Sequence, residues 1–213
     1  MKLASDVAVV HGEEELFART AHLFAGAEEV ICAANTLNTW AVSRQRRVPS
    51  GEATGRRVRK LYRPGVLLEP GPAAHLRELE RLGAEIRITP DEINETIILD
   101  RRTAILAGDL SYGERSFSVV TRPEVVQSVL SLFNAAWRGG TPVSAFDAEF
   151  AEVRALLPRI LDALASGCKD ETAARTLGLG LRTYRRRVAE LMSALGATSR
   201  FQAGARAREL GLI

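Results

Sequence analysis

Residues 178–195, G-L-G-L-R-T-Y-R-R-R-V-A-E-L-M-S-A-L, decide the fold of the C-terminal part of the chain. Two glycines stand at the start, and four arginines fall within positions 182–187. At about 100° per residue, the apolar side chains form one stripe of a helix. The pattern predicts an amphipathic helix that starts near Leu181 and packs this stripe against other helices. The stripe consists of Tyr184, Val188, Leu191, Met192 and Leu195.

The residues around this helix predict further helices that are separated by glycines. One helix is expected over 150–166, ending at Gly167, a short one over 170–177, ending at Gly178, and a last one from Phe201 to Gly211. Two helices joined by a short turn that contains glycine form the helix-turn-helix unit. The second helix then points Arg182, Arg186 and Ala189 outward, with Arg185 and Arg187 on its two shoulders.

An outward face of this kind suits a helix lying in the major groove of DNA. Arginine makes bidentate contacts to guanine, and a small residue such as Ala189 permits close approach. Thr183, near the helix start, and the shoulder arginines are placed to meet phosphates. Charge favours the same partner, because residues 151–213 carry a net charge of +5 and the first 150 residues a net charge of −2.

Residues 165–213 resemble the LuxR-type (GerE-like) helix-turn-helix domain. The resemblance implies that Arg185, Arg186 and Ala189 face bases, that Thr183 and Arg187 meet the backbone, and that Arg200 lies near the DNA or a dimer contact. Three residues depart from the family pattern: Thr172, Gly180 and Tyr184. The matched landmarks are Gly167, Ala174, Leu177, Gly178, Thr183, the basic triplet 185–187, Leu195–Gly196, Ser199–Arg200, Ala203 and the terminal G-L-I.

Upstream, helices and strands alternate, which predicts an α/β domain with a mixed sheet. Helices are expected over 8–26, 73–83 and from Pro123 to Trp137; strands are expected over 29–34, 57–62, 86–89 and 116–121, with a hairpin over 96–108 turning at Asp100–Arg102. The stretch R-G-G-T-P-V-S at 138–144 marks the boundary. The expected division is an α/β sensor or dimerisation domain over 1–140, a linker over 141–149 and an all-α four-helix domain over 150–213.

The order of these elements resembles the phospholipase-D-like domain that precedes some helix-turn-helix domains in bacterial regulators. The catalytic hairpin of that family carries H-x-K-x-x-x-x-D. With Asp100 on the aspartate, Ile93 takes the place of the nucleophilic histidine and Glu95 that of the phosphate-binding lysine. Isoleucine cannot attack phosphorus and glutamate repels phosphate, so we expect no enzyme activity and a turn role for Asp100. Phosphodiester hydrolysis and a protein-interaction module are the alternatives.

If the domain binds an effector, its pocket is expected near the ends of the strands, where an active site would lie. Asn35, Tyr62, Arg63 and Glu95 are the candidate effector-binding residues. The basic stretch from Arg44 to Arg63 is read as a solvated loop and strand face, and Trp40 and Trp137 as core or subunit-interface residues. A domain of this type pairs with its twin, so we expect a homodimer on two-fold operators.

Composition bounds the remaining function classes. The first twenty residues contain no continuous apolar core, so no signal peptide is expected, and no apolar run reaches the length of a membrane span. Cys32 and Cys168 stand far apart, without clustered histidines, so neither a disulfide framework nor a metal site is indicated. The sequence thus predicts a cytoplasmic regulator that needs no cofactor. Its expected partners are double-stranded DNA and a second copy, and RNA polymerase and a small-molecule effector are compatible with the resemblance.

Overall fold

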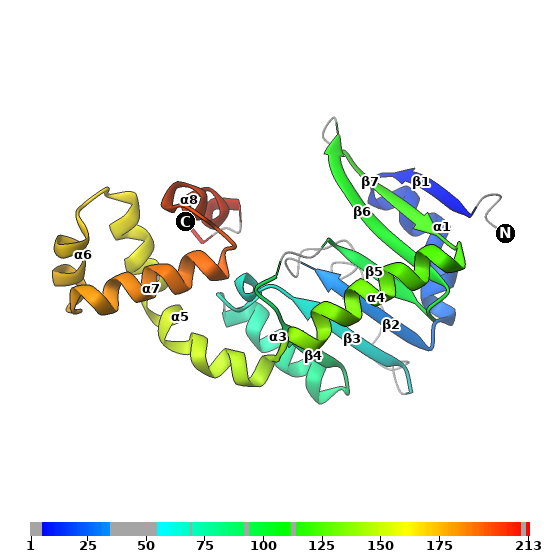
Figure 1. Cartoon of the computed structure of the whole chain (residues 1–213), viewed down its shortest axis with the longest axis horizontal. Helices are drawn as coiled ribbons and strands as arrows, with labels where there is room; N and C mark the ends of the chain where they lie inside the picture. The colour runs from blue at the N-terminus through cyan, green and yellow to red at the C-terminus, as the bar shows by residue number, and fades with distance from the viewer. Residues whose placement is uncertain (1–5, 35–54, 69, 92–93, 112–113, 210–211) are drawn as a thin grey trace.

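The chain builds an α/β part followed by a helical part (Figure 1). The computed structural model describes residues 6–34, 55–68, 70–91, 94–111, 114–209 and 212–213. The α/β part contains a mixed sheet with strand order β1-β7-β6-β5-β2-β3-β4-β8. The strands are β1 (Val7–His11), β2 (Glu29–Ala34), β3 (Arg57–Tyr62), β4 (Glu85–Ile88), β5 (Thr96–Leu99), β6 (Thr103–Ser111), β7 (Glu114–Val120) and β8 (Thr141–Pro142).

Helices cover both faces of the sheet. On one face, α1 (Gly12–Gly26) and α3 (Pro70–Arg81) contribute Leu16 and Leu76 to a core with Cys32 and other strand residues. On the other face, α4 (Pro123–Gly139) packs on strand residues such as Ile31. Successive side chains of β2 point alternately into these two clusters, as the pleat of a strand requires. A buried strand covered on both sides reads as a continuous apolar run, and this is why E-V-I-C-A-A was recognisable.

The mixed sheet and most of its elements confirm the sequence predictions. β2, β3 and β4 are mutually parallel, whereas β5 pairs antiparallel with both β2 and β6. The hairpin turns where expected: Asp100 and Arg101 have φ angles of 50° and 56°. Two consecutive residues with positive φ form the turn whose twist matches that of the flanking strands.

The helix expected over 8–26 is wrong at its start. Residues 7–11 form strand β1, which pairs antiparallel with β7, and α1 begins only at Gly12. Val10 is buried while Val9 is exposed, which is the two-residue period of a strand. The alternation is short and runs directly into a helical pattern, so the two periods merge when the sequence is read alone.

The expected linker over 141–149 is also replaced by ordered structure. Thr141 and Pro142 form the edge strand β8, which pairs with β4, and helix α5 (Val143–Ala165) follows without a break. Proline is tolerated in an edge strand because it has no N–H to donate, and none is needed on the side that faces solvent. The Gly-Thr-Pro sequence thus forms a short edge strand directly before a helix, rather than an extended linker.

The helical part consists of α5, α6 (Asp170–Leu177), α7 (Leu181–Ala194) and α8 (Arg200–Glu209), which lie together at one end of the sheet (Figure 1). Their buried side chains form a hydrophobic cluster of their own, with Leu157, Ala174 and Leu191 among its members. The helices expected over 170–177 and from Leu181 are confirmed. A single-turn helix, η1 (Pro64–Leu67), follows β3 and contacts α3, α5 and α7.

Candidate nucleic-acid interface

A tight glycine turn sets the angle between α6 and α7. Gly178 adopts the left-handed conformation with a φ of 71°. Its N–H donates to the Arg175 carbonyl at 3.1 Å, and the Leu179 N–H donates to the Ala174 carbonyl at 2.8 Å. These two bonds satisfy the last carbonyls of α6 in a Schellman motif, in which glycine avoids the steric cost of positive φ. Gly180 then precedes α7 with extended backbone and no side-chain cap.

The buried side of α7 matches the stripe expected from the sequence. Tyr184, Val188 and Leu191 are all buried in the helical cluster, together with Ala173 and Ala174 of α6. Met192, at the edge of the stripe, is half-buried. Tyr184, one of the departures from the LuxR-type pattern, is thus accommodated as a core residue. Burial of this stripe stabilises α7, because a short helix is marginal in water without tertiary packing.

The opposite side of α7 presents arginines to solvent. Arg182, Arg185 and Arg186 are exposed, and so is Ala189 one turn further on. Thr183 is half-buried near the helix start. Arg186 is 3.6 Å from Glu190 across one turn, an exposed contact that contributes little to stability. The structure therefore brings four of the predicted residues onto one accessible surface.

Asp170 ties two of the predicted residues together. One carboxylate oxygen of Asp170 is 2.9 Å from Arg185 Nε and the other is 2.7 Å from an Arg200 terminal nitrogen. The side chain of Asp170 is only 13% exposed although both arginines are largely exposed. The hydrogen bonds from Arg185 and then Arg200 hold the Asp170 pKa below its usual value. Three helices, α6, α7 and α8, thus meet at one carboxylate.

Asp170 was missed in the sequence analysis, although a signal was present. It is the first residue of α6, a position where a carboxylate interacts favourably with the helix dipole. That local reason is enough to explain an aspartate there. Its contact with Arg200 joins residues thirty positions apart and depends on how α8 folds back.

The expected exposed position of Arg187 is wrong. Arg187 is only 9% exposed, and its guanidinium pairs with Glu190 at 2.8 Å and with Glu152 of α5. Its Nε is buried without a hydrogen-bond partner among the described residues. The two shoulders of α7 are equivalent in an isolated helix, but α5 packs against the Arg187 side only. Arg187 therefore joins α5 to α7 and is not presented to solvent.

Two of the candidate effector residues lie on the same face of the sheet. Tyr62 ends β3 with its side chain fully buried, and no described residue accepts or donates a hydrogen bond at its hydroxyl. Glu95 is nearly buried and pairs with Arg115 at 2.5 Å. Burial raises the pKa of the Cys32 thiol to about 11, and the nearby Glu95 carboxylate also raises it. Burial, and then the charge of Cys32, raise the pKa of Tyr62. Lys60, opposite Cys32 on β3, is buried too, and burial lowers its pKa.

Arg63 and Asn35 do not join this group. Arg63 turns toward the helical part, where its guanidinium lies against Gly196, and it donates to the Pro90 carbonyl at 3.4 Å. Asn35 lies outside the described residues, as do Trp40 and the Arg44–Arg47 portion of the basic stretch. The structure therefore places Tyr62 and Glu95 on opposite sides of β2, each near Cys32, and turns Arg63 away from them.

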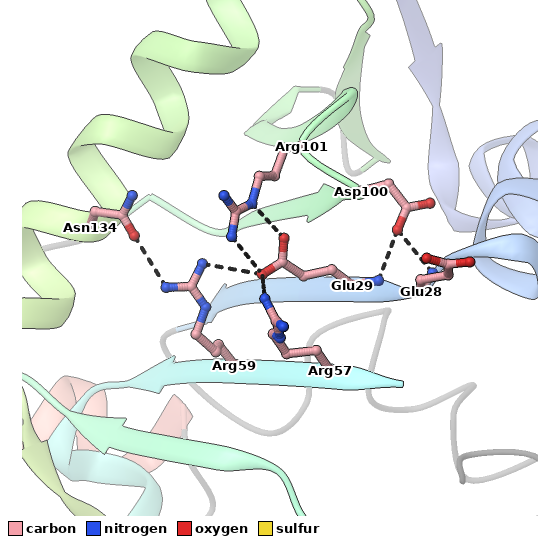
Figure 2. A network of polar contacts seen from close by, with 7 residues as sticks. All are labelled: Glu28, Glu29, Arg57, Arg59, Asp100, Arg101 and Asn134. Atoms are coloured by element: carbon pink, nitrogen blue, oxygen red, sulfur yellow. Dashed lines mark hydrogen bonds and ion pairs between the residues drawn. The ribbon is translucent and has the colours of Figure 1, made fainter. Parts of the chain in front are cut away.

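Asp100 has the turn role expected for it and an anchoring role as well. Its Oδ1 accepts hydrogen bonds from the backbone N–H groups of Glu28 and Glu29 at 2.9 and 2.8 Å (Figure 2). The Glu29 carboxylate in turn contacts three guanidinium groups, and Arg59 also donates to Asn134 of α4. Those guanidinium groups belong to Arg57, Arg59 and Arg101. Asp100 thus holds the hairpin to the start of β2.

Residue 95, where the resemblance expects a phosphate-binding lysine, carries a negative charge. The Glu95 carboxylate is neutralised by Arg115, and Ile93 lies outside the described residues.

Within the described part of the chain, no three His, Cys, Asp or Glu side chains gather as metal ligands. No helix there has the length and apolar character needed to span a membrane.

Comparison with known proteins finds a similar regulatory protein by sequence and distantly similar solved structures by fold. No family model matches the chain. A bialaphos biosynthetic pathway regulatory protein from Streptomyces hygroscopicus is 37% identical over 145 residues, which are 68% of this chain and 57% of that protein. The chain thus spans a little over half the length of this curated relative.

Two solved structures resemble this chain in fold. TrmBL2, described as an archaeal chromatin protein with a novel mode of DNA binding, superposes with a TM-score of 0.53 at 17% identity, covering 67% of this chain and 56% of that one. Nuc from Salmonella typhimurium, a phospholipase D family member, gives a TM-score of 0.50 at 14% identity, covering 64% of this chain and 97% of that one. At these identities the likeness establishes the fold alone.

Proposed function

We propose that this protein is a transcriptional regulator that binds specific sequences of double-stranded DNA through α7. The observation that carries the proposal is the exposed surface of α7, here called the reading surface. Its side chains, opposite a packed apolar stripe, are those of Arg182, Arg185, Arg186 and Ala189. Donors on a rigid helix are what readout of base edges requires. The similarity to a pathway regulatory protein supports the same role.

Each side chain of the surface has a role in this proposal. Arg185 and Arg186 read base edges, and Ala189 allows the groove wall to approach. Thr183, at the helix start, and Arg200, at the start of α8, contact phosphates. In the free protein Asp170 holds Arg185 and Arg200 in place, so DNA binding exchanges these ion pairs for contacts with bases and phosphates. Arg187 supports the surface from behind.

The regulator acts as a homodimer. Phe201, which follows Arg200 on α8, is 89% exposed, and in this proposal its apolar ring packs against a second copy. The small residues Gly204 and Ala205 on the following turn allow close approach of a second α8. A two-fold pairing places two α7 helices on successive half-sites of an operator.

The α/β domain senses rather than catalyses. Glu95 occupies the position of the phosphate-binding lysine and is committed to Arg115. The neighbouring Tyr62 hydroxyl is buried without a described partner, which is unusual and points to a group that a ligand satisfies. Tyr62 and Glu95 are therefore the effector-contacting residues of this proposal, and RNA polymerase is a further partner of the regulator.

Selection of duplexes from a random-sequence pool, followed by mobility-shift titration, tests the proposal. Replacing both Arg185 and Arg186 with alanine is expected to abolish binding to the selected duplex and leave the unfolding temperature nearly unchanged, because neither side chain is buried. Arg81→Ala, which removes an exposed arginine from α3, serves as the control. Affinity of the double variant equal to that of the control contradicts the proposal.

A further inference from the structure

The segment that leaves β3 reaches from the sheet into the helical part. It runs from Arg63 through the single-turn helix η1 to Leu68. Leu68 is only 1% exposed and belongs to the hydrophobic cluster of the helical part. The other buried members described for that cluster lie between Val153 and Ala207. One leucine of the α/β domain is therefore a core residue of the domain that follows.

Polar contacts fix the same segment in place. The Nε of Arg154, on α5, donates to the Leu67 carbonyl at 2.6 Å. Arg154 directly follows Val153, a buried member of the same cluster as Leu68, so both the backbone and a side chain of the segment join it to the helical part. A bond between a guanidinium and a carbonyl in a half-buried position has a defined geometry and is lost if the two parts separate.

At its other end, the segment contacts the turn that terminates α7. Gly196 follows α7 with a φ of 64°, and a side-chain carbon added there would overlap the guanidinium groups of both Arg63 and Arg206. Arg206, on α8, donates to the Leu195 carbonyl at 2.7 Å and also to the Gly196 carbonyl. Two guanidinium groups thus enclose the C-terminal end of α7, one from α8 and one from the α/β domain.

Arg63 is also the neighbour of the candidate effector residue Tyr62. The Tyr62 carbonyl accepts a hydrogen bond from the Thr89 N–H at 2.9 Å, and the Arg63 side chain donates to the carbonyl of Pro90. The end of β3 therefore has the buried Tyr62 hydroxyl on one residue and the contact with Gly196 on the next. A displacement of this strand end moves both.

We propose that residues 63–68 are the coupling element through which the α/β domain holds α7 in the orientation that binds DNA. The inference rests on the proposed function. The geometry indicates that docking of the segment favours DNA binding. The segment contacts the C-terminal end of α7 and leaves Arg182, Arg185 and Arg186 exposed. The docked arrangement is thus open to DNA, and a perturbation at Tyr62 that releases the segment lowers affinity.

Two substitutions test the coupling from its two ends. Leu68→Ala removes the apolar contact, and Arg63→Ala removes the contact with the turn at Gly196. Each has a matched control: Leu16→Ala, in α1, truncates an equally buried leucine of the sheet core, and Arg81→Ala, in α3, removes an exposed arginine. Arg63→Lys keeps the charge and tests whether the planar guanidinium is needed.

Two measurements on the full chain separate docking from its consequence. Amide hydrogen exchange over residues 191–207 reports whether the end of α7 is held. Titration of a duplex that the wild-type protein selects from a random pool reports affinity. We expect Leu68→Ala and Arg63→Ala to accelerate exchange over 191–207 and to weaken DNA binding at least fivefold, within the range typical of coupled sites, while both controls leave these residues and the affinity unchanged.

The outcomes distinguish the two proposals. Unchanged exchange in both variants overturns the docking contact, and faster exchange with wild-type affinity overturns the coupling but not the DNA-binding function. If the wild-type protein selects no duplex, the proposed function fails and the coupling falls with it. If Leu68→Ala unfolds, Arg63→Ala decides the question, because Arg63 lies outside the buried core of either domain.

Discussion

The two shoulders of α7 carry the same kind of side chain in opposite surroundings. Arg185 is exposed and pairs with Asp170 and Glu171, whereas Arg187 is buried and pairs with Glu152 and Glu190. Arg185 can exchange its carboxylate for another anion without disturbing the core, but Arg187 cannot. The identity of the residue thus says little about its role until the neighbouring helices are in place.

The largest effect is expected from Arg187→Ala. It removes packing between α5 and α7 and the shorter of the two ion pairs of the partly buried Glu190, which should lower the free energy of unfolding by about 2 kcal/mol. Chemical denaturation followed by circular dichroism measures this. Under conditions where the variant is folded, its preference among DNA sequences should equal that of the wild type.

Arg175→Ala is the control for this measurement, because Arg175 is exposed on α6. A stability change no larger than that of the control would mean that the ion pairs of Arg187 make no net contribution. Equal weakening of binding to all duplexes in the folded variant would return Arg187 to the phosphate-contacting group that the resemblance implies.

The next effect is expected from Arg185→Ala, with the opposite signature. Loss of a bidentate contact to a base costs about 1–3 kcal/mol of discrimination at one position of the site. The free energy of unfolding should change by less than about 0.5 kcal/mol, since Arg185 is exposed. Competition between the selected duplex and single-base variants measures the discrimination. Equal weakening for all duplexes would instead assign Arg185 to phosphate contact.

How far the sequence predicted this contrast depends on the range of the interactions. The apolar stripe of α7 and the outward face were predictable, because helical periodicity is local and Tyr184, Val188 and Leu191 follow it. Arg187 was placed wrongly because Glu152 belongs to another helix. Asp170 was overlooked because its contact with Arg200 depends on the return of α8.

The α/β domain shows the same division between local and distant information. The hairpin at Asp100 was predictable from its turn residues. The strand β1 was missed, because a few alternating residues next to a helical pattern acquire their identity from pairing with β7, which lies about a hundred positions away. The burial of Leu68 in the helical part could not be predicted, because the four-residue helix η1 is too short to show a hydrophobic period.

A smaller effect is expected from Asp170→Asn, which sharpens the contrast from the carboxylate side. The change removes the ion pairs of Asp170 with Arg185 and Arg200 and a negative charge beside the reading surface, so affinity for all duplexes should rise about threefold at low salt. Stability should fall by a few tenths of a kcal/mol, because the first turn of α6 loses a favourable charge. Fluorescence anisotropy with a non-selected duplex measures the affinity.

Glu78→Gln makes the same change of net charge on α3, far along the chain from α7, and is the control for Asp170→Asn. A rise of equal size in the control would attribute the gain to net charge. Lower affinity in Asp170→Asn would show that Asp170 positions the two arginines rather than competing with the phosphates for them.

The smallest effect is expected in the titration of Asp170 itself. Its hydrogen bonds to Arg185 and Arg200 hold the folded-state pKa below the usual value of 3.8. The stabilisation from these pairs is therefore fully present above that usual value and is lost as the pH falls through the lower folded-state pKa. Carboxyl-carbon NMR should show the Asp170 midpoint rising toward the usual value in Arg185→Ala, because the bond from Arg185 is the largest cause, and remaining in place in Arg187→Ala. A midpoint that moves equally in both variants would mean that the two shoulders are coupled through α7, and that the exposed arginine does not exchange partners independently of the buried one.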